Sequence, residues 1–481
     1  MKMIKALVAV AVIGALMPAV AQVPDALREA ARQAVTSNPE VQARWHAFLA
    51  AEQDQKEVEA GYRPTIDLVT GVGRVVQSRP NLTPRSESFT RRSASVQLTQ
   101  MVYDGFYTKN QVARFGHARL VRYYELLDAA ERTALEAVRA YGDVLRYREL
   151  VRYAQDNYVQ HRQVLDQIAS RTAAGVGRRA DLEQATGRLA LAESNLLTEV
   201  ANLHDVSARY LRVVGRPAPE TMAPLGDLLV GNVVPATVQD ALRDALNANA
   251  GLNAAMENVL ADERQVEALR APFRPRLDLR ARASRDRSID RFFVDGTSGD
   301  NVVEFVMTYN LSRGGADEAR LRRAAESVNE ARDMREKVCR DVRQQLAIAY
   351  NDAKRLKEQL AFLDQHQMST EKAREAFRQQ FAIGQRTLLD LLDTENEYFQ
   401  ARRAYTSGVY EQILAVARTL TEMGRLTRTL DVTRESLPTP QELGQQRTGV
   451  DPAAICPPEA PAIAPIDKEA IFSAAMRAAG R

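Results

Sequence analysis

The chain contains two copies of one segment, and this internal repeat constrains the fold more than any other feature. Residues 27–68 align without a gap to residues 238–279, with 13 identities in 42 positions. Among them, Asn38, Glu52 and Arg63-Pro64 recur as Asn249, Glu263 and Arg274-Pro275. Each copy precedes an alternating apolar stretch and then a very long run without proline. We therefore expect two similar halves, 22–236 and 237–430, each built as helix, β-hairpin, long helix, turn and helix.

Residues 1–21 have the pattern of a secretory signal peptide. Lys2 and Lys5 precede the apolar residues 6–16, and Ala19-Val20-Ala21 is an A-x-A cleavage site. A buried N-terminal helix is the alternative interpretation. We expect the segment to be removed and the chain to be exported, without a lipid-modified cysteine at the new N-terminus.

The charge balance argues against a nucleic-acid binder. The formal net charge is +3, with 26% charged residues. Removing the two signal-peptide lysines leaves +1 (3 − 2), whereas nucleic-acid binders carry a clear basic excess. No later segment reaches the roughly 18 consecutive apolar residues of a membrane helix. We expect the protein to be soluble or to cross a membrane as strands.

Two proline-free runs predict very long helices. Of the 19 prolines, none lies between Pro84 and Pro217 or between Pro275 and Pro438. An interior proline costs a helix about 3 kcal/mol, so long helices require its absence. Apolar residues in both runs step by threes and fours in a narrow seam, which is typical of coiled coils. A helix over about 108–172 would be roughly 100 Å long.

Each run is interrupted once by glycine, which predicts a helical hairpin. The interruptions are near 175–177 and near 384, and glycine is the usual residue after a helix C-terminus. The helix after the first turn, about 180–213, has only half the length of the one before it. We expect the opening helix, about 24–60, to stack end to end with it and supply the missing half. The helices of the second repeat have the same relation of lengths, so we expect the same stacking there.

Alternating stretches at the other end of each hairpin predict four half-buried strands. They form two hairpins, 65–102 and 276–311, of about 12 residues per strand. The polar connections are expected over Gln77–Arg92 and Arg285–Asn301. Such strands are long enough to cross a bilayer when tilted; hairpins packed on a soluble core are the alternative. Four strands cannot close a barrel, and lipid does not tolerate an open sheet edge. Membrane strands would therefore require several copies of the chain.

These features resemble the TolC family of outer-membrane channel-tunnels over nearly all of the chain to about residue 430. The resemblance rests on the twinned helices ending in Arg63-Pro64 and Arg274-Pro275, and on Tyr103-Asp104-Gly105 and Arg313-Gly314-Gly315. The most specific stretch is Gly384–Glu395 (GQRTLLDLLDTE). The resemblance implies a mostly α fold that trimerises into a 12-stranded outer-membrane β-barrel over an α-helical periplasmic tunnel. The implied partners are a periplasmic adaptor and an inner-membrane ABC transporter or efflux pump.

The resemblance also assigns a gate and a tip. Asp390 and Asp393, three apart on one helix face, would form two carboxylate rings in the tunnel that favour cations. Arg386 matches the family's gate-locking arginine, Glu183 takes the place of its acidic partner, and Phe381 stands where the family often has a tyrosine. Val176, Gly177, Ile383 and Gly384 would contact the adaptor at the periplasmic tip, although the glycines also act as helix caps. From the sequence, Asp390 and Asp393 are both expected to lie past the first turn of their helix.

No enzyme or cofactor site is indicated. The five histidines never fall at i, i+3 or i, i+4, so no helical metal pair exists. Gly175–Ala180 matches G-x-G-x-x-A but follows a helix instead of the strand that dinucleotide binding requires.

The sequence leaves three functions open. We expect an exit channel for type I protein secretion; the alternatives are a drug or metal efflux channel and a periplasmic coiled-coil scaffold. The extension 431–481 is rich in proline and is expected to be disordered or wrapped on the fold, with a short helix at 466–479. For Cys339 and Cys456 we expect two unpaired thiols, with a disulfide as the alternative.

Overall fold

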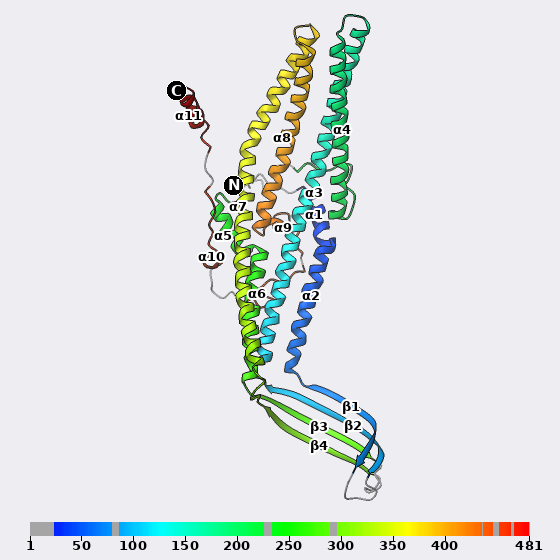
Figure 1. Ribbon diagram of the computed structural model, residues 1–481, viewed down its shortest axis with the longest axis vertical. Coiled ribbons are helices and arrows are strands. Elements are labelled where there is room, and N and C mark those ends of the chain that lie inside the picture. Colours follow the sequence, from blue (N-terminus) through cyan, green and yellow to red (C-terminus); the bar gives the residue numbers. More distant parts are fainter. Residues whose placement is uncertain are drawn as a thin grey trace, which may run out of the picture.

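The computed structural model describes residues 24–78, 86–225, 233–288, 296–434, 436–445, 452–462 and 466–480. It is a long bundle of helices with a four-stranded sheet at one end and two helical hairpin turns at the other (Figure 1). The expected signal peptide, 1–21, lies outside the described residues.

Both repeats run through the same series of elements. The first contains α1 (Asp25–Ser37), α2 (Pro39–Glu59), η1 (Ala60–Tyr62), β1 (Thr65–Ser78), β2 (Ser86–Tyr103), α3 (Tyr107–Ala173) and α4 (Arg179–Val214). The second contains α5 (Val238–Ala248), α6 (Ala250–Ala268), η2 (Ala271–Phe273), β3 (Arg276–Ser288), β4 (Gly296–Thr308), α7 (Ala316–Ala382), α8 (Leu388–Glu422) and α9 (Leu426–Thr429). The extension adds α10 (Pro452–Ile455) and α11 (Lys468–Ala479).

The two longest helices, α3 and α7, have 67 residues each, which gives about 100 Å at 1.5 Å per residue. The shorter helices cover them in series: α2 packs on the half of α3 near the sheet, and α4 on the half near the tip (Figure 1). Figure 1 shows α6 and α8 in the same arrangement along α7. The end-to-end stacking expected from helix lengths is therefore observed.

The opening segment of each repeat is two helices, whereas the sequence pattern predicted one, over 24–60 in the first repeat. Asn38 adopts an extended conformation, and its side-chain oxygen accepts a bond from the Glu40 N–H at 2.9 Å. Pro39 disfavours helical geometry at the residue before it, and asparagine is a strong N-cap. Asn249 breaks the second copy in the same way, accepting from the Leu252 N–H at 3.0 Å.

The sheet is antiparallel in the order β1-β2-β3-β4. Its strands extend further than expected, so the predicted connections Gln77–Arg92 and Arg285–Asn301 are too long. Pairing continues through Gly73↔Arg91 and Arg287↔Thr297, where apolar alternation has already ended. Main-chain hydrogen bonds do not depend on side-chain polarity, so the ladder continues beyond the sequence signal.

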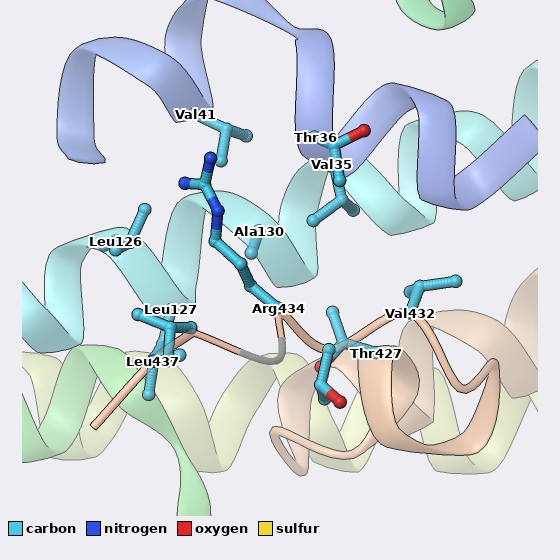
Figure 2. Close-up of a pocket in the computed structure, with 11 residues that line it drawn as sticks. Val35, Thr36, Val41, Leu126, Leu127, Ala130, Thr427, Val432, Arg434 and Leu437 are labelled. Atoms are coloured by element: carbon cyan, nitrogen blue, oxygen red, sulfur yellow. The ribbon is translucent and has the colours of Figure 1, made fainter. Parts of the chain in front are cut away.

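The main core lies where α1, α3, α4, α8 and α9 meet. Its α1 and α3 positions include many alanines with no exposed surface, among them Ala30, Ala34, Ala134 and Ala137. Small side chains let helix axes approach closely. A cavity of about 40 Å³ remains between α1, α2, α3 and residues 427–437, with Arg434 extending across it (Figure 2). Ligand sites usually need 300–1,000 Å³, so this cavity is a packing defect.

Glu131 of α3 is a buried carboxylate beside this core. It is 7% exposed and accepts bonds from the Leu426 N–H at 3.0 Å and the Thr427 hydroxyl at 2.6 Å. Burial raises its pKa to about 7, against the lowering effect of these donors. Glu131 therefore caps the start of α9, although burial makes its charged form energetically unfavourable.

A folded-state pKa above the unfolded value means that stability is present at low pH and lost as pH rises. We expect the parent to lose up to about 3 kcal/mol between pH 4.5 and 7 relative to Glu131→Gln, which cannot ionise. Denaturant unfolding at both pH values measures this, with Glu136→Gln on the surface of α3 as the control. Parallel pH profiles for the parent and Glu131→Gln would contradict it.

Cys339 and Cys456 form a disulfide with a Cα–Cα distance of 5.8 Å, so the expectation of two unpaired thiols is wrong. Both are buried, in a cluster with Leu246 and Leu252. Their sequence separation is 117, so no local sequence pattern indicates that they lie close together. The disulfide attaches the C-terminal strap, defined as residues 436–445 and 452–462, to α7.

Polar contacts also hold the C-terminal strap on both repeats. Arg119 of α3 donates to the Leu443 carbonyl at 2.7 Å, and Gln445 donates to Glu257 of α6 at 2.8 Å. Arg343 of α7 pairs with Glu459 at 3.0 Å. These parts of the extension are wrapped on the fold, one of the two expected outcomes, and α11 forms the expected terminal helix.

The disulfide predicts that the native protein has no thiol that reacts without reduction. Protein denatured in SDS should take up two maleimide labels after reduction and none before it. Cys456→Ser should lower the free energy of unfolding by about 2–4 kcal/mol and expose the strap to limited proteolysis. Labelling of the unreduced, denatured parent would contradict the pairing.

Candidate functional site

The two hairpin turns form the end of the molecule opposite the sheet (Figure 1). Gly384 has φ +77° and the Gln385 N–H bonds to the Gln380 carbonyl at 2.8 Å, which closes the α7–α8 turn. In the α3–α4 turn the left-handed residue is Gly175, with φ +78°. Gly177 is needed for space instead, since a Cβ there would lie 2.7 Å from the Thr172 hydroxyl.

Val176 and Ile383 stand at the apices of these turns. They are 80% and 70% exposed. An apolar side chain exposed to this degree at a loop apex contributes nothing to the core of its own chain. The four predicted tip residues, Val176, Gly177, Ile383 and Gly384, therefore lie together at one end, and two of them present apolar surface.

Asp390 lies in the first turn of α8, which corrects the expectation that it lies past it. Thr387 is the N-cap, and a capping box joins the two: the Thr387 hydroxyl accepts from the Asp390 N–H at 3.2 Å, and the Asp390 carboxylate accepts from the Thr387 N–H at 3.1 Å. Hydrogen bonds from Thr387 lower the pKa of Asp390. The T-x-x-D pattern was visible in the sequence as a capping-box signal.

Asp393, one turn further along α8, pairs with Arg188 of α4. This ion pair links the first helical hairpin to the second near the tip. Beneath it, Val164, Ile168, Leu388, Leu391 and Leu392 form an apolar cluster from α3 and α8, with Phe381 packed against it. The two hairpins are therefore fastened to each other close to their turns.

Arg386 contacts its own hairpin. Its guanidinium lies 4.0 Å from Asp390, donates to Gln380 at 3.0 Å and stacks 4.3 Å from the Phe377 ring centroid. Glu183 is exposed on α4, and within the described part of the chain no ion pair joins it to Arg386. One chain thus brings Arg386 together with Asp390 and leaves Glu183 apart.

Buried ion pairs lower in the hairpins were not identified from sequence as site residues. Glu395 of α8 is 4% exposed and lies 2.7 Å from Arg374 and 2.8 Å from Arg378 of α7. Glu199 of α4 is 2% exposed and pairs with Arg403 of α8. The sequence signal for such a buried ion pair is a charged residue at a position on the apolar face of a helix. No cluster of three or more His, Cys, Asp or Glu side chains suited to a metal ion occurs among the described residues.

The sheet separates two chemical surfaces, which follow from its register. The apolar side carries Ile66, Leu68, Val96, Leu98, Ala281, Ala283, Val303, Phe305 and Met307. The polar side carries Asp67, Gln97, Thr99, Arg280, Arg282, Ser284, Asp300 and Glu304. Phe305 is 68% exposed, so the apolar side is not covered by this chain.

Aromatic residues gather where the sheet meets the helices. They are Tyr62, Phe106, Tyr107, Phe273 and Tyr309, each about half exposed. Tyr62 and Phe273 are repeat equivalents at the ends of η1 and η2. Aromatic girdles of this kind mark the membrane–water interface in membrane proteins.

A family model described as outer membrane efflux protein matches residues 30–216 and 241–425, which covers both repeats. The chain belongs to this family of outer-membrane channels. Membership confirms the resemblance to TolC, the outer-membrane location and the expectation that the chain is not an enzyme, and it favours the channel interpretations over the scaffold. No helix in the described ranges is both long and apolar enough to cross a bilayer.

Individual proteins are similar to this chain in sequence or in fold. Outer membrane efflux protein BepC of Brucella suis is 25% identical over 430 residues, 89% of this chain and 91% of BepC. Proteases secretion protein PrtF of Dickeya chrysanthemi is 28% identical over 253 residues, 50% and 53% of the two chains. Outer membrane protein TolC of Escherichia coli is 22% identical over 345 residues, 69% of each chain. The Campylobacter jejuni CmeC outer membrane channel has the same fold, with a TM-score of 0.76 at 13% identity over 87% of this chain and 89% of CmeC.

The position of Arg386 predicts a role in holding the tip closed. Arg386→Ser removes its contacts to Asp390, Gln380 and Phe377. The ion pair is exposed and worth at most about 1 kcal/mol, so we expect the open probability to rise by up to about fivefold per chain.

Asp390→Asn with Asp393→Asn should reduce cation selectivity, because two carboxylates per chain are neutralised.

Planar-bilayer recordings measure both effects. Arg162→Ser is the control, since this exposed arginine pairs with Asp166 on its own helix at 3.3 Å and lies away from the turns. A parent-like open probability in Arg386→Ser and a parent-like selectivity in the double variant would remove these residues from the gate.

Proposed function

We propose that this chain is the outer-membrane exit channel of a tripartite export system and that three copies build the channel. The observation that carries the proposal is the sheet: four strands with one apolar side and unpaired outer edges at β1 and β4. Membrane barrels start at eight strands, so two or more chains must join. Three chains supply twelve strands, and their long helices would continue the barrel as a tunnel.

The dimensions of the strands support a membrane position. Each has 13 to 18 residues, and a tilted strand crosses a bilayer in about 9–11. The aromatic residues at the sheet–helix junction would mark the periplasmic interface. The polar side of the sheet, with its mixed charges, would then line the water-filled interior, as in other outer-membrane barrels.

The tip is the proposed contact with a periplasmic adaptor, through which an inner-membrane transporter would reach the channel. The exposed Val176 and Ile383 support this assignment because apolar groups at loop apices are suited to a partner's helical surface. Gly177 and Gly384 shape the turns that present them. The gate residues Asp390, Asp393, Arg386, Glu183 and Phe381 lie within the next two turns of helix or on the adjoining hairpin.

For cargo, we infer unfolded protein delivered by an ABC transporter, as in type I secretion. The similarity to PrtF, whose name describes protease secretion, supports this cargo. Efflux of small molecules is the second candidate, supported by the broader match to BepC, which is named an efflux protein. Both candidates use the same channel and differ in the transporter behind it.

A gene deletion in the native host separates the two cargoes. If the channel serves secretion, deletion should abolish at least one major extracellular protein while leaving sensitivity to dyes, detergents and antibiotics unchanged. Increased drug sensitivity with a normal secretome would establish efflux instead. If the deletion affects neither protein secretion nor drug sensitivity, the channel proposal itself is contradicted.

Complementation with tip variants tests the adaptor contact. Val176→Asp with Ile383→Asp adds two charges per chain at exposed apices, so we expect normal trimer levels but at least tenfold weaker adaptor binding and export. Ile348→Asp is the matched control, an isoleucine 52% exposed on α7 far from the turn. Full export by the double variant would refute the tip assignment.

A further inference from the structure

The charged residues of the sheet are distributed unequally between its two sides. In the part of the sheet that the structure describes, strand register places the aspartates and glutamates on the polar side. The apolar side of these described strand residues has no carboxylate, yet it carries several arginines. The basic collar is defined as three of them, Arg74, Arg92 and Arg285.

The members of the basic collar occupy adjacent positions. Arg285 of β3 is opposite Ala94, which lies two residues after Arg92 along β2. Arg74 of β1 is opposite Thr90, two residues before Arg92 along β2. All three side chains are exposed. Arg92 is therefore the diagonal neighbour of both other arginines, at a spacing that long side chains can reach, and an anion between them would offset the repulsion of their like charges.

Among the described residues, the contacts of Arg74 and Arg285 are with uncharged groups. Arg74 donates to the Ser88 hydroxyl at 3.0 Å, and Arg285 donates to the Ser284 carbonyl at 2.9 Å. Gly299 opposite Arg285 leaves room for this side chain, because a Cβ at residue 299 would lie 2.4 Å from the Arg285 guanidinium. By contrast, Arg91 points to the polar side and pairs with Asp286 at 3.1 Å.

The basic collar lies at the end of the sheet that is distant from the helices (Figure 1). Arg285 is eight residues beyond Leu277, which is level with the aromatic junction; this is about 26 Å along a strand. With the usual tilt of about 40°, the collar lies about 20–30 Å above that junction, where the roughly 25 Å apolar band of an outer-membrane barrel ends. The collar therefore coincides with the outer interface.

We propose that the basic collar binds the phosphorylated head groups of outer-leaflet lipids. Guanidinium groups bind phosphate oxygens with two parallel hydrogen bonds, and their weak hydration suits them to an interface. Apolar side chains immediately below, at Val96 and Val303, would contact the acyl chains of the same lipid. This assignment rests on the proposed function, because it requires the sheet to span the outer membrane.

The test uses the full-length trimer purified in detergent, with lipid A as the probe. Native mass spectrometry counts the lipids bound to the parent and to Arg74→Gln/Arg92→Gln/Arg285→Gln. Each guanidinium–phosphate contact is charge-assisted, so we expect affinity to fall on the order of tenfold or more. Lipid A from which both phosphates have been removed should bind the parent as weakly as intact lipid A binds the triple variant.

Arg91→Gln is the matched control, because it removes the same charge from the neighbouring residue on the opposite side. It should bind lipid A as the parent does. The single variants Arg74→Gln and Arg92→Gln should show intermediate losses, which keeps the test valid if the triple variant does not fold. Equal binding by the parent and by both single variants overturns the proposal, as does an equal loss in Arg91→Gln.

Competition with inorganic phosphate distinguishes a lipid site from a free-anion site. Displacement of lipid A by millimolar phosphate would overturn the lipid assignment. Conductance of the parent in planar bilayers is measured in parallel. A parent that forms channels but does not retain lipid A contradicts only the collar, whereas a parent that forms no channel contradicts the proposed function.

Discussion

A helix of 67 residues carries an apolar seam about 100 Å long, and covering that seam is the constraint on which the molecule depends. An isolated helix gains little from its own hydrogen bonds, so packing along its whole length must stabilise it. Each repeat meets this requirement with two shorter helices placed in series, α2 and α4 on α3, and α6 and α8 on α7. Where the shorter helices meet, the chain has room for α1, α5, α9 and the C-terminal strap. The main core, where these elements meet, follows from the mismatch in helix length.

The two ends of the bundle face different environments, and their residues differ accordingly. At one end, a sheet with an apolar side and a polar side is suited to lipid outside and water inside. At the other, the turns are short, capped and glycine-dependent, and Val176 and Ile383 are the large apolar side chains at their apices. Between the ends, buried ion pairs such as Glu395 with Arg374 join neighbouring helices. The cost of removing both charges from water offsets much of the attraction within such a pair.

The two helical hairpins of one chain are fastened to each other near the tip. The Asp393–Arg188 pair and the cluster around Leu391 belong to one chain, whereas the contact expected between Arg386 and Glu183 is absent within it. In the proposed trimer, opening at the tip would therefore separate neighbouring chains while the two hairpins of each chain stay together. The contacts of Arg386 within its own hairpin would add to the contacts between chains in opposing this movement.

The sequence alone determined the features that repeat or that follow a period. Gapless duplication, proline-free runs, glycine interruptions and alternation set the order and type of the elements, because helices and strands impose fixed spacings on the residues they bury. Tertiary structure decided what depends on residues distant in sequence or on main-chain geometry. Cys339 meets Cys456 only because the extension folds back along α7, and Arg188 meets Asp393 only because two hairpins pack. The strands end where backbone pairing ends. The basic collar depends on strand register, because Arg74, Arg92 and Arg285 lie on one side of the sheet only when the strands are paired as observed.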